Sequence, residues 1–321
     1  MIAERRSLKA KNKLALVIGV NGQDGSYLAQ HLHLRNWTIF GIGRHSSARR
    51  EVSNYLATYR QIDIVDTTAF QRCLTELRPD AIFHTAAIHG PSGFKYEDVW
   101  LDAYRVNTIS LHATLEYARL ENKNAQVVYL SSAKVFGDLH GKTITEATPR
   151  TSECIYSITK NAAESAISYY RDNYGINASV LWMFNHESER RTHEYFIMKI
   201  ISALKNCLTD KTHKTNVRSL DFWCDWGSAS EYMEILTKSC DFLRGDDYIL
   251  ATGKTVWARD VVREFFFRHG LASEDHICTD VPIMKKPTDF WSASNEKFKR
   301  ATGFSPTISG IEVFENVLSK I

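Results

Sequence analysis

The sequence predicts an α/β fold: a doubly wound parallel sheet of the Rossmann type, followed by a smaller, mostly C-terminal α/β lobe. Two observations predict this class. Short apolar runs alternate with helical stretches through the first half of the chain, and a glycine-rich turn follows the first apolar run. Continuous apolar strands spaced by helices are typical of a parallel sheet that helices cover on both faces.

The apolar runs give the expected strands, which are Leu14–Gly19, Thr38–Gly43, Gln61–Ile64, Ala81–Thr85, Val127–Ser131 and Ala178–Met183. The expected helices between them are Ser26–Arg35, Thr68–Leu77, Asp98–Leu120 and Ile155–Asn173. Beyond Asn185 the alternation is less regular. There we expect helices at Glu194–Cys207 and Ser228–Leu243, a strand at Tyr248–Ala251, and short helices after Arg259.

Composition narrows the class of protein. The 321 residues are 44% hydrophobic and 24% charged, which is ordinary for a globular chain, and the net charge of +3 argues against nucleic-acid binding. No apolar run approaches the roughly 18 to 20 residues of a membrane span, and the basic N-terminus lacks the apolar core of a signal peptide. The six cysteines are scattered, so we expect free thiols, a cytoplasmic location and no metal site.

The glycine-rich turn predicts a dinucleotide site. The first strand leads directly into Gly19-Val20-Asn21-Gly22-Gln23-Asp24-Gly25, and a helix follows. Glycines there let the backbone turn tightly and approach a pyrophosphate, which then lies at the helix N-terminus. The alternative is a tight turn without a ligand.

The end of the second strand bears on the choice of cofactor. An acidic residue there would bind the ribose diol of NAD, but the sequence has Arg44, Ser46 and Ser47, with two more arginines beyond. A cation and hydroxyls suit a 2′-phosphate, so we expect NADP, with NAD as the alternative. The interpretation without a cofactor role is that these residues form a solvated basic loop. Asp63 is expected either to accept a hydrogen bond from the adenine or to cap a helix. The remaining expected cofactor contacts are Ile64, Thr85, Ala86 and Ala87.

A catalytic set follows from Tyr156 and Lys160. Their spacing of four places both side chains on one face of a helix, where the ammonium is expected to lower the pKa of the phenol and to hold the nicotinamide ribose. Ser132, at the end of the fifth strand, is expected to bind the same substrate oxygen that Tyr156 protonates or deprotonates. Together with the glycine turn, these residues predict an oxidoreductase acting on a hydroxylated substrate.

From about Leu14 to the C-terminus the chain resembles the extended short-chain dehydrogenases, and most closely the GDP-mannose 4,6-dehydratase family. The segments that carry the resemblance are ALVIGVNGQDGSYLAQHL (15–32), GIGRHSSARR (41–50), FNHESERR (184–191), DWGSASEY (225–232) and DDYILATGKT (246–255). The resemblance implies a nucleotide-diphosphate sugar as substrate, GDP-linked, and a homodimer or homotetramer. It also implies substrate contacts from Asn185, Lys199 and Lys286. The structural alternatives are a helix cap for Asn185 and a surface charge for Lys199.

The chain departs from this family at the catalytic strand end. The dehydratases carry Thr-Ser-Glu there, whereas this sequence has Ser132-Ala133-Lys134. Elimination needs a base for the C5 proton, and a protonated lysine cannot accept it. We therefore expect hydride transfer at C4 without 4,6-elimination. Lys134 is expected to act either as a new acid–base group or as a solvated lysine at the mouth of the pocket.

Other departures concern the substrate lobe. Cys224 replaces a family arginine, and Arg218 is expected to bind phosphate in its place; otherwise the nucleotide is not GDP. His89 and His186 are expected near the sugar, with a structural role as the alternative for each.

Three further functions stay open: a true 4,6-dehydratase with altered acid–base residues, a non-catalytic dinucleotide sensor and, least supported, a nucleic-acid binder. We expect a flexible tail at 1–12, an NAD(P)-binding domain at 13–185 and a substrate lobe at 186–321, with part of 220–255 returning to the first domain.

Overall fold

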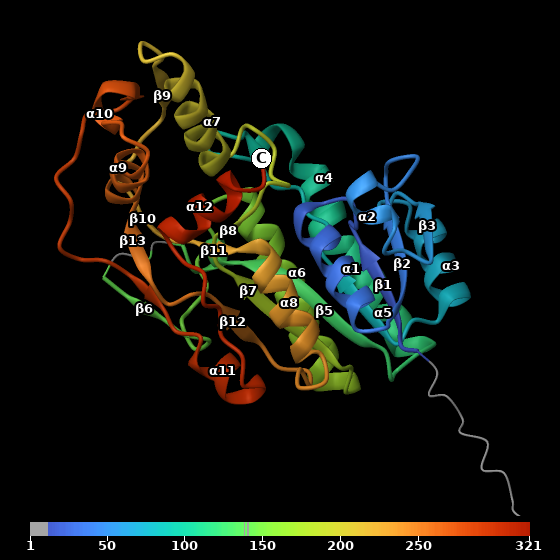
Figure 1. Cartoon of the computed structure of the whole chain (residues 1–321). Helices are drawn as coiled ribbons and strands as arrows, with labels where there is room; N and C mark the ends of the chain where they lie inside the picture. Colours follow the sequence, from blue (N-terminus) through green and yellow to red (C-terminus); the bar gives the residue numbers. More distant parts are fainter. Residues whose placement is uncertain (1–11, 138, 140) are drawn as a thin grey trace, which may run out of the picture.

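The computed structural model describes residues 12–137, 139 and 141–321, so the expected flexible tail lies outside the described residues except for its last position. Its centre is a seven-stranded sheet in which every neighbouring pair of strands is parallel (Figure 1). The spatial order is β12 (Tyr248–Leu250), β7 (Ala178–Met183), β5 (Gln126–Ser132), β4 (Ala81–His84), β1 (Leu14–Ile18), β2 (Thr38–Gly43) and β3 (Thr58–Gln61). The strand order reverses direction at β1, as a doubly wound sheet requires.

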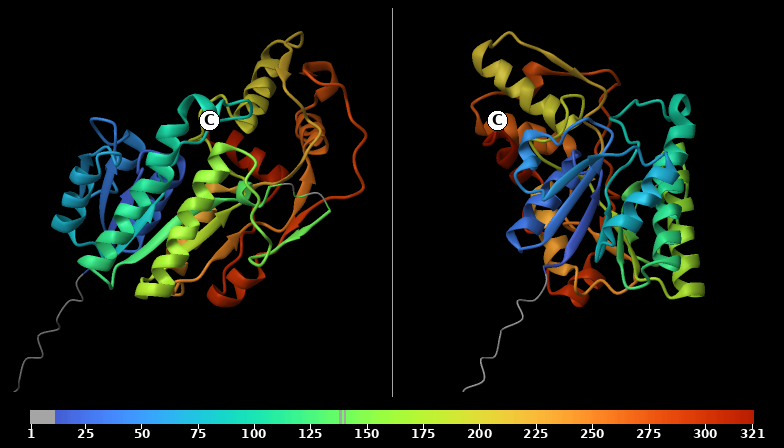
Figure 2. Two further views of the ribbon diagram at one scale, coloured as in Figure 1. Left: turned by 180° about the vertical axis from the view of Figure 1, so that it is seen from behind. Right: turned by 90° about the vertical axis from the view of Figure 1, so that its right-hand side faces the viewer.

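Helices cover both faces of this sheet (Figure 2). On β1, Leu16 and Ile18 pack into one apolar layer, while Ala15 and Val17 pack into the other, because successive strand residues point to opposite faces. The first layer is closed by α3 (Thr67–Leu77), α5 (Ser110–Leu120) and α6 (Ile155–Tyr174). The second layer is closed by α1 (Gln23–Leu34) and α8 (Ala229–Ser239), which pack against each other.

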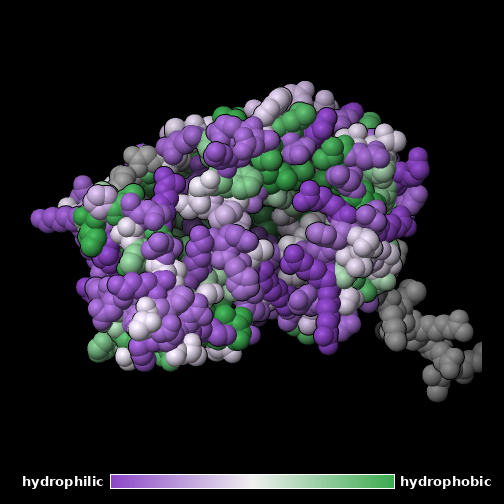
Figure 3. Space-filling model, turned by 90° about the horizontal axis from the view of Figure 1, so that it is seen from above, coloured by the Kyte–Doolittle hydropathy of each residue, from purple (hydrophilic) through white to green (hydrophobic). Residues whose placement is uncertain are grey.

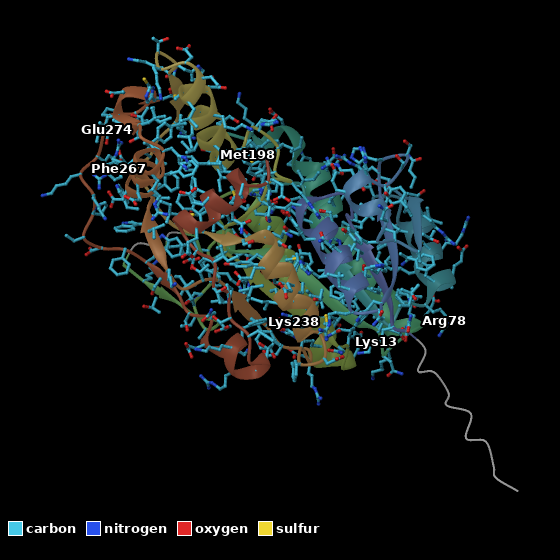
Figure 4. The ribbon with its side chains drawn as sticks, viewed as in Figure 1. Lys13, Arg78, Met198, Lys238, Phe267 and Glu274 are labelled. Carbon is cyan, nitrogen blue, oxygen red and sulfur yellow. The ribbon has the colours of Figure 1, made fainter. Side chains whose placement is uncertain are left out.

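The C-terminal lobe has its own apolar core. It is built from α7 (Phe196–Thr209), α9 (Ala258–Arg268) and α12 (Ile311–Leu318), together with β9 (Thr215–Val217), β10 (Trp223–Asp225) and β14 (Ile277–Thr279). Met198 of α7 and Phe267 of α9 lie in this lobe, far from Lys13 and Arg78 at the amino-terminal edge of the large sheet (Figure 4).

Short elements complete the described chain. β10 pairs with β13 (Thr255–Trp257), β14 with β9, β11 (Gly227–Ser228) with β8 (His186–Glu187), and β15 (Ser292–Ala293) with β6 (Thr143–Ile144). The remaining short helices are α2 (Arg50–Ser53), α4 (Trp100–Tyr104), α10 (Ser273–His276) and α11 (Glu296–Thr302).

The chain returns from the lobe to the large sheet. β12 pairs in parallel with β7, with Tyr248 opposite Leu181, and extends the sheet to its seventh strand. Directly before it, α8 covers the sheet beside α1. Asp225 joins the two parts from the lobe side: its buried carboxylate accepts hydrogen bonds from Thr252 and from the backbone of Gly253.

Two expected elements are wrong in detail. The strand expected at Gln61–Ile64 lies at Thr58–Gln61, because this edge strand pairs with β2 through polar residues that the apolar pattern does not mark. The single helix expected over Asp98–Leu120 is broken: a 3₁₀ turn at Tyr96–Val99 precedes α4, and a π-helical turn at Arg105–Ile109 separates α4 from α5.

All six cysteines are free thiols. Within residues 12–137, 139 and 141–321, no helix has both the length and the apolar character needed to cross a membrane.

Candidate functional site

A cleft of about 420 Å³ lies at the carboxyl ends of β1, β4 and β5. Figure 3 views this end of the molecule from above and shows a hollow near the middle of the face. In an open parallel sheet, ligands bind at this edge, beside the point where the strand order reverses. The cleft is lined by all the expected cofactor residues except Ser46 and Ser47, and by all the expected catalytic residues.

The glycine turn forms a cradle that side chains would fill. Gly19 has a φ of +83°, and a Cβ there would lie 2.8 Å from the backbone nitrogen of Ala86. A Cβ on Gly25 would lie 2.5 Å from the Gly19 carbonyl oxygen. Gly22 precedes α1, and no side chain caps the free N–H groups of this helix. The cradle therefore fits a dinucleotide pyrophosphate, which would bind those N–H groups.

Asn21 joins this cradle to the loop after β2. Its amide nitrogen donates to the Ser47 carbonyl oxygen at 3.0 Å, and its amide oxygen accepts from the Arg49 backbone N–H at 2.9 Å. Tyr59 and Gln61 of β3 donate to the carbonyl oxygens of His45 and Arg44. The loop is thus held from both sides by side chains.

Two arginines of this loop face the cleft. Arg44 and Arg49 line it, both are exposed, and within the part of the chain that the structure describes neither forms an ion pair. Asp63 also lines the cleft, but its carboxylate accepts a hydrogen bond from the Val65 backbone N–H, and Asp66 is the residue that caps α3. The positive charge at the end of β2 is therefore not neutralised by a neighbouring carboxylate.

The first two turns of α6 carry the catalytic pair. Tyr156 and Lys160 are 6% and 2% exposed, and the Lys160 ammonium donates to the Leu130 carbonyl oxygen at 2.7 Å. Burial lowers the pKa of Lys160 to about 7, against the opposing effect of the Glu164 and Asp24 carboxylates. Burial also raises the pKa of Tyr156 well above its ordinary value, although a hydrogen bond with Ser132 acts in the opposite direction. The expected lowering of the tyrosine pKa is therefore wrong for this arrangement of side chains.

A buried carboxylate follows one turn later on the same helix face. Glu164 accepts from the Trp182 indole at 3.0 Å, from the Ser131 hydroxyl, and from Arg150 at 2.9 Å. Its contacts tie α6 to the end of β5, where Ser132 begins a 3₁₀ turn over Ala133–Phe136. Sequence analysis missed this residue, although its spacing of four from Lys160 was a usable signal.

The π-helical turn holds a second missed residue. Asn107 is fully buried; its amide oxygen accepts from the Ile88 backbone N–H at 2.8 Å, and its amide nitrogen donates to the Thr159 hydroxyl at 3.0 Å. Thr159 lies between Tyr156 and Lys160 on α6. Asn107 therefore fixes the loop after β4 against the catalytic helix, and π-helical turns occur frequently at functional sites.

A buried ion pair connects the glycine turn to the chain beyond β7. His186 donates from Nδ1 to the Phe184 carbonyl oxygen at 2.7 Å, and its Nε2 lies 3.0 Å from Oδ1 of Asp24. Burial opposes both charges, but the attraction between them prevails: the pKa of His186 is raised and that of Asp24 is held well below its usual range. Arg191 lowers the pKa of Asp24 further and opposes the raised pKa of His186. Arg191 itself pairs with Glu187 at 3.2 Å. His186 is thus a charged structural residue of the site.

Lys134 and His89 border the reacting end. Lys134 is exposed and lines the cleft, and its backbone N–H donates to the Ser132 hydroxyl at 3.2 Å. The His89 ring lies 4.8 Å from the Tyr156 ring and contacts the Tyr195 hydroxyl at 3.2 Å. The side chain of His89 is exposed within the cleft, and desolvation by the cleft walls, followed by the surrounding cations, lowers its pKa, so its imidazole is neutral.

Several expected substrate residues lie elsewhere. Asn185 lines the cleft with His89 and His186, whereas Lys199, Arg218 and Lys286 do not. Lys199 is exposed on α7, and Arg218 is exposed just after β9. Lys286 pairs with Asp260 at 2.6 Å, and its ammonium lies 5.0 Å from the Trp223 ring centre. Arg191 and Tyr195, which also line the cleft, were not predicted from the sequence, and Arg49, one of the two arginines noted beyond Ser47, lines it too. No cluster of three or more possible metal-binding side chains occurs among the described residues.

Known proteins resemble the chain along most of its length. Residues 16–317 match the family described as GDP-mannose 4,6 dehydratase. GDP-mannose 4,6 dehydratase 1 of Arabidopsis thaliana is 27% identical over 312 residues, covering 92% of this chain and 86% of that protein. A GDP-mannose 4,6-dehydratase of Sordaria araneosa is 29% identical over 259 residues, or 79% of this chain. The match spans only about half of that longer protein, 47% of its length.

Solved structures share the fold. The dTDP-glucose 4,6-dehydratase of Bacillus anthracis, in complex with NAD, superposes with a TM-score of 0.79 at 18% identity over 96% of both chains. RMD from Pseudomonas aeruginosa, complexed with NADPH, gives 0.78 at 18% identity over 96% of this chain and 98% of that one. Together with the family match and the glycine cradle, they lead to one conclusion: the chain belongs to the GDP-mannose 4,6 dehydratase family of extended short-chain dehydrogenases, enzymes that use a nicotinamide dinucleotide to modify nucleotide sugars.

Proposed function

We propose that this enzyme transfers hydride at C4 of a GDP-linked sugar, as a dehydrogenase, 4-keto reductase or epimerase, without the elimination of water that names its family. The observation that carries the proposal is Lys134. It lines the reacting end of the cleft where the family's dehydratases carry glutamate, and a lysine ammonium cannot accept the C5 proton.

The groups needed for C4 chemistry are assembled. A bound nicotinamide dinucleotide supplies the acceptor or donor of hydride. Tyr156 exchanges a proton with the sugar oxygen, Ser132 orients that oxygen, and Lys160 binds the ribose beside them. Burial raises the pKa of the Tyr156 phenol, so this residue carries the proton that a keto oxygen would accept in reduction and that the phenolate would take back in oxidation.

The choice of NADP over NAD rests on Arg44 and Arg49. Both guanidinium groups line the cleft at the end of β2 without an ion pair among the described residues, and a 2′-phosphate would supply the missing anion. Ser46 and Ser47 are exposed outside the cleft lining, so the cations carry this expectation.

The quaternary structure we infer is a homodimer, or a homotetramer built from it. Exposed apolar side chains lie on α4, the π-helical turn and α6: Trp100, Leu101, Ile109, Ile158 and Tyr169. Such a concentration of apolar surface on neighbouring helices supports a subunit interface.

Six free thiols support a reducing, cytoplasmic location. We retain the division into a cofactor domain at 13–185 and a substrate lobe at 186–321, with part of 220–255 returning to the cofactor domain, as part of the proposal.

Product analysis tests the reaction class. Incubation with GDP-mannose and NADP⁺ is expected to give no 4-keto-6-deoxy sugar by NMR and mass spectrometry. Efficient loss of the C6 hydroxyl would instead establish a 4,6-dehydratase with altered acid–base residues. One observation favours that second candidate: His89 is a neutral imidazole beside Tyr156, and it would then be the elimination base. His186 is excluded from that role because both of its ring nitrogens are engaged.

A further inference from the structure

The reacting end of the cleft carries several cations, of which one, Lys134, has no paired carboxylate among the described residues. Four cations act on the His89 ring, namely Arg191, Lys160, Lys134 and His186, and no carboxylate is among the main influences on it. Two of these cations are paired within the protein, Arg191 with Glu187 and His186 with Asp24. Their charges are therefore already balanced.

The two lysines differ in what they contact. Lys160 is buried, and its ammonium donates to the Leu130 carbonyl oxygen. Lys134 is exposed to the cleft, and its ammonium has no hydrogen-bond or ion-pair partner within residues 12–137, 139 and 141–321. Lys134 is thus a cation that is free to bind a ligand.

The position of Lys134 relates it to the sugar rather than to the cofactor phosphates. The cradle of Gly19–Gly25 follows β1, whereas Lys134 follows β5 and lies two residues from Ser132 in a fixed 3₁₀ turn. If Ser132 and Tyr156 hold the reacting oxygen, Lys134 faces a substituent on a neighbouring carbon. A hydroxymethyl group there would leave the ammonium without a counter-charge.

We propose that the sugar carries a carboxylate on the ring carbon adjacent to the one that exchanges hydride, as in a nucleotide-linked hexuronate. We further propose that Lys134 binds this carboxylate. This inference rests on the proposed C4 hydride transfer and names its substrate class. The ion pair also has a chemical purpose. A keto group at C4 makes a C6 carboxylate part of a β-keto acid, and an ammonium bound to the carboxylate keeps the negative charge on its oxygens and so opposes loss of CO₂.

The test compares substrates that differ only at C6: GDP-mannose with GDP-mannuronate, and UDP-glucose with UDP-glucuronate. The holoenzyme is assayed with NADP⁺ by nicotinamide absorbance, and products are identified by NMR. We expect kcat/KM for the acid to exceed that for the matched neutral sugar by about tenfold or more, the range of a hydrogen bond to a charged group. In Lys134→Met this preference is expected to vanish, and in Lys134→Arg to persist. The control is Lys211→Met, an exposed lysine outside the cleft.

Two results would overturn the inference. One is an equal or greater kcat/KM for the neutral sugars; the other is an acid preference that survives in Lys134→Met. A preference that survives together with a loss of the same size for acid and neutral substrates would assign Lys134 to the diphosphate. Turnover of neutral sugars alone would leave the proposed function intact. If none of the four compounds is turned over, oxidation and epimerisation of these sugars fail as the proposed function and only the 4-keto reductase form remains; the ratio of Kd values for acid and neutral sugars, measured by calorimetry, still decides the role of Lys134.

Discussion

The His186 imidazole donates one hydrogen bond to the backbone and directs its other ring nitrogen at the Asp24 carboxylate, 3.0 Å away. Because a carbonyl oxygen and a carboxylate only accept, both ring nitrogens carry protons and the ring is charged. The pair lies beside the glycine turn, so it neutralises a carboxylate close to the cradle that fits a pyrophosphate.

This pairing predicts a pH dependence of cofactor binding. The pKa of His186 is raised, so its charge is complete below the ordinary imidazole value and is lost as pH rises through the raised one. Above that pH, Asp24 keeps only the weaker influence of Arg191 to balance its charge near the pyrophosphate, and we expect the Kd for NADPH to rise about three- to tenfold. Fluorescence titration between pH 6 and pH 9 measures it. Asp24→Asn should lose the part of the pH dependence that comes from His186 and keep the limb that comes from Lys160; a pH dependence unchanged in that variant would refute the explanation.

The loop after β2 predicts cofactor choice. Arg44→Ala and Arg49→Ala should each raise the Kd for NADPH about tenfold and leave the Kd for NADH unchanged, because only NADPH carries the 2′-phosphate. Arg35→Ala, which removes an exposed arginine outside the cleft, serves as the control. Equal weakening of both cofactors would assign the arginines to the adenine or the pyrophosphate instead.

Removal of the Tyr156 hydroxyl separates chemistry from binding. Tyr156→Phe should lower kcat by about 10²- to 10⁴-fold, the range of general acid–base catalysis, and leave cofactor binding intact. Tyr96→Phe is the matched control, since the Tyr96 ring stacks on Tyr156 with ring centres 5.7 Å apart. Full catalytic activity of Tyr156→Phe would assign the proton transfer to another group, whereas an unaffected phenotype in a strain that carries Tyr156→Phe would support a sensor.

The Glu164 carboxylate is expected to act through Lys160. It is the larger of the two influences that raise the Lys160 pKa against burial. In Glu164→Gln the ammonium should therefore be lost at a lower pH, and the alkaline limb of the NADPH-binding profile should move to lower pH. The weakened bond to Arg150 should cost about 1–3 kcal/mol of the free energy of unfolding. A stability loss without a shifted profile would reduce Glu164 to a structural role. The control is Glu116→Gln on α5, because Glu116 also pairs with an arginine, Arg119.

The bounds of a strand could be predicted from the sequence where its side chains all face the apolar interior. β1, β2 and β7 are interior strands whose residues are buried or half-buried, so their apolar runs marked them within a residue at either end. β3 lies at the sheet edge, and its polar Tyr59 and Gln61 hold the cofactor loop, so an apolar pattern misplaced it by three residues. The π-helical turn at Arg105–Ile109 depends on contacts of Asn107 with residues far along the chain, which periodicity does not contain.

The candidate site likewise contains residues that local sequence spacing predicts and residues that it does not. Gly19–Gly25, Tyr156 and Lys160 were predictable because local spacing fixes their geometry. Lys286 was transferred by resemblance, but an ion pair with Asp260 and an aromatic contact with Trp223 hold it away from the cleft lining. The charge of His186 was also out of reach, since Asp24 is 162 positions away along the chain.

The return of β12 and α8 to the large sheet means that the two lobes are not separable by a single cut. A polypeptide ending at Asn185 would leave β7 as an unpaired edge strand, and its N–H and C=O groups would be free to pair with another chain. It would also strip α8 from the apolar layer beside α1 and expose that layer to water. We expect such a fragment to aggregate, so a nucleotide-sugar lobe could be exchanged between relatives only as two inserts, with the strand and helix left in place.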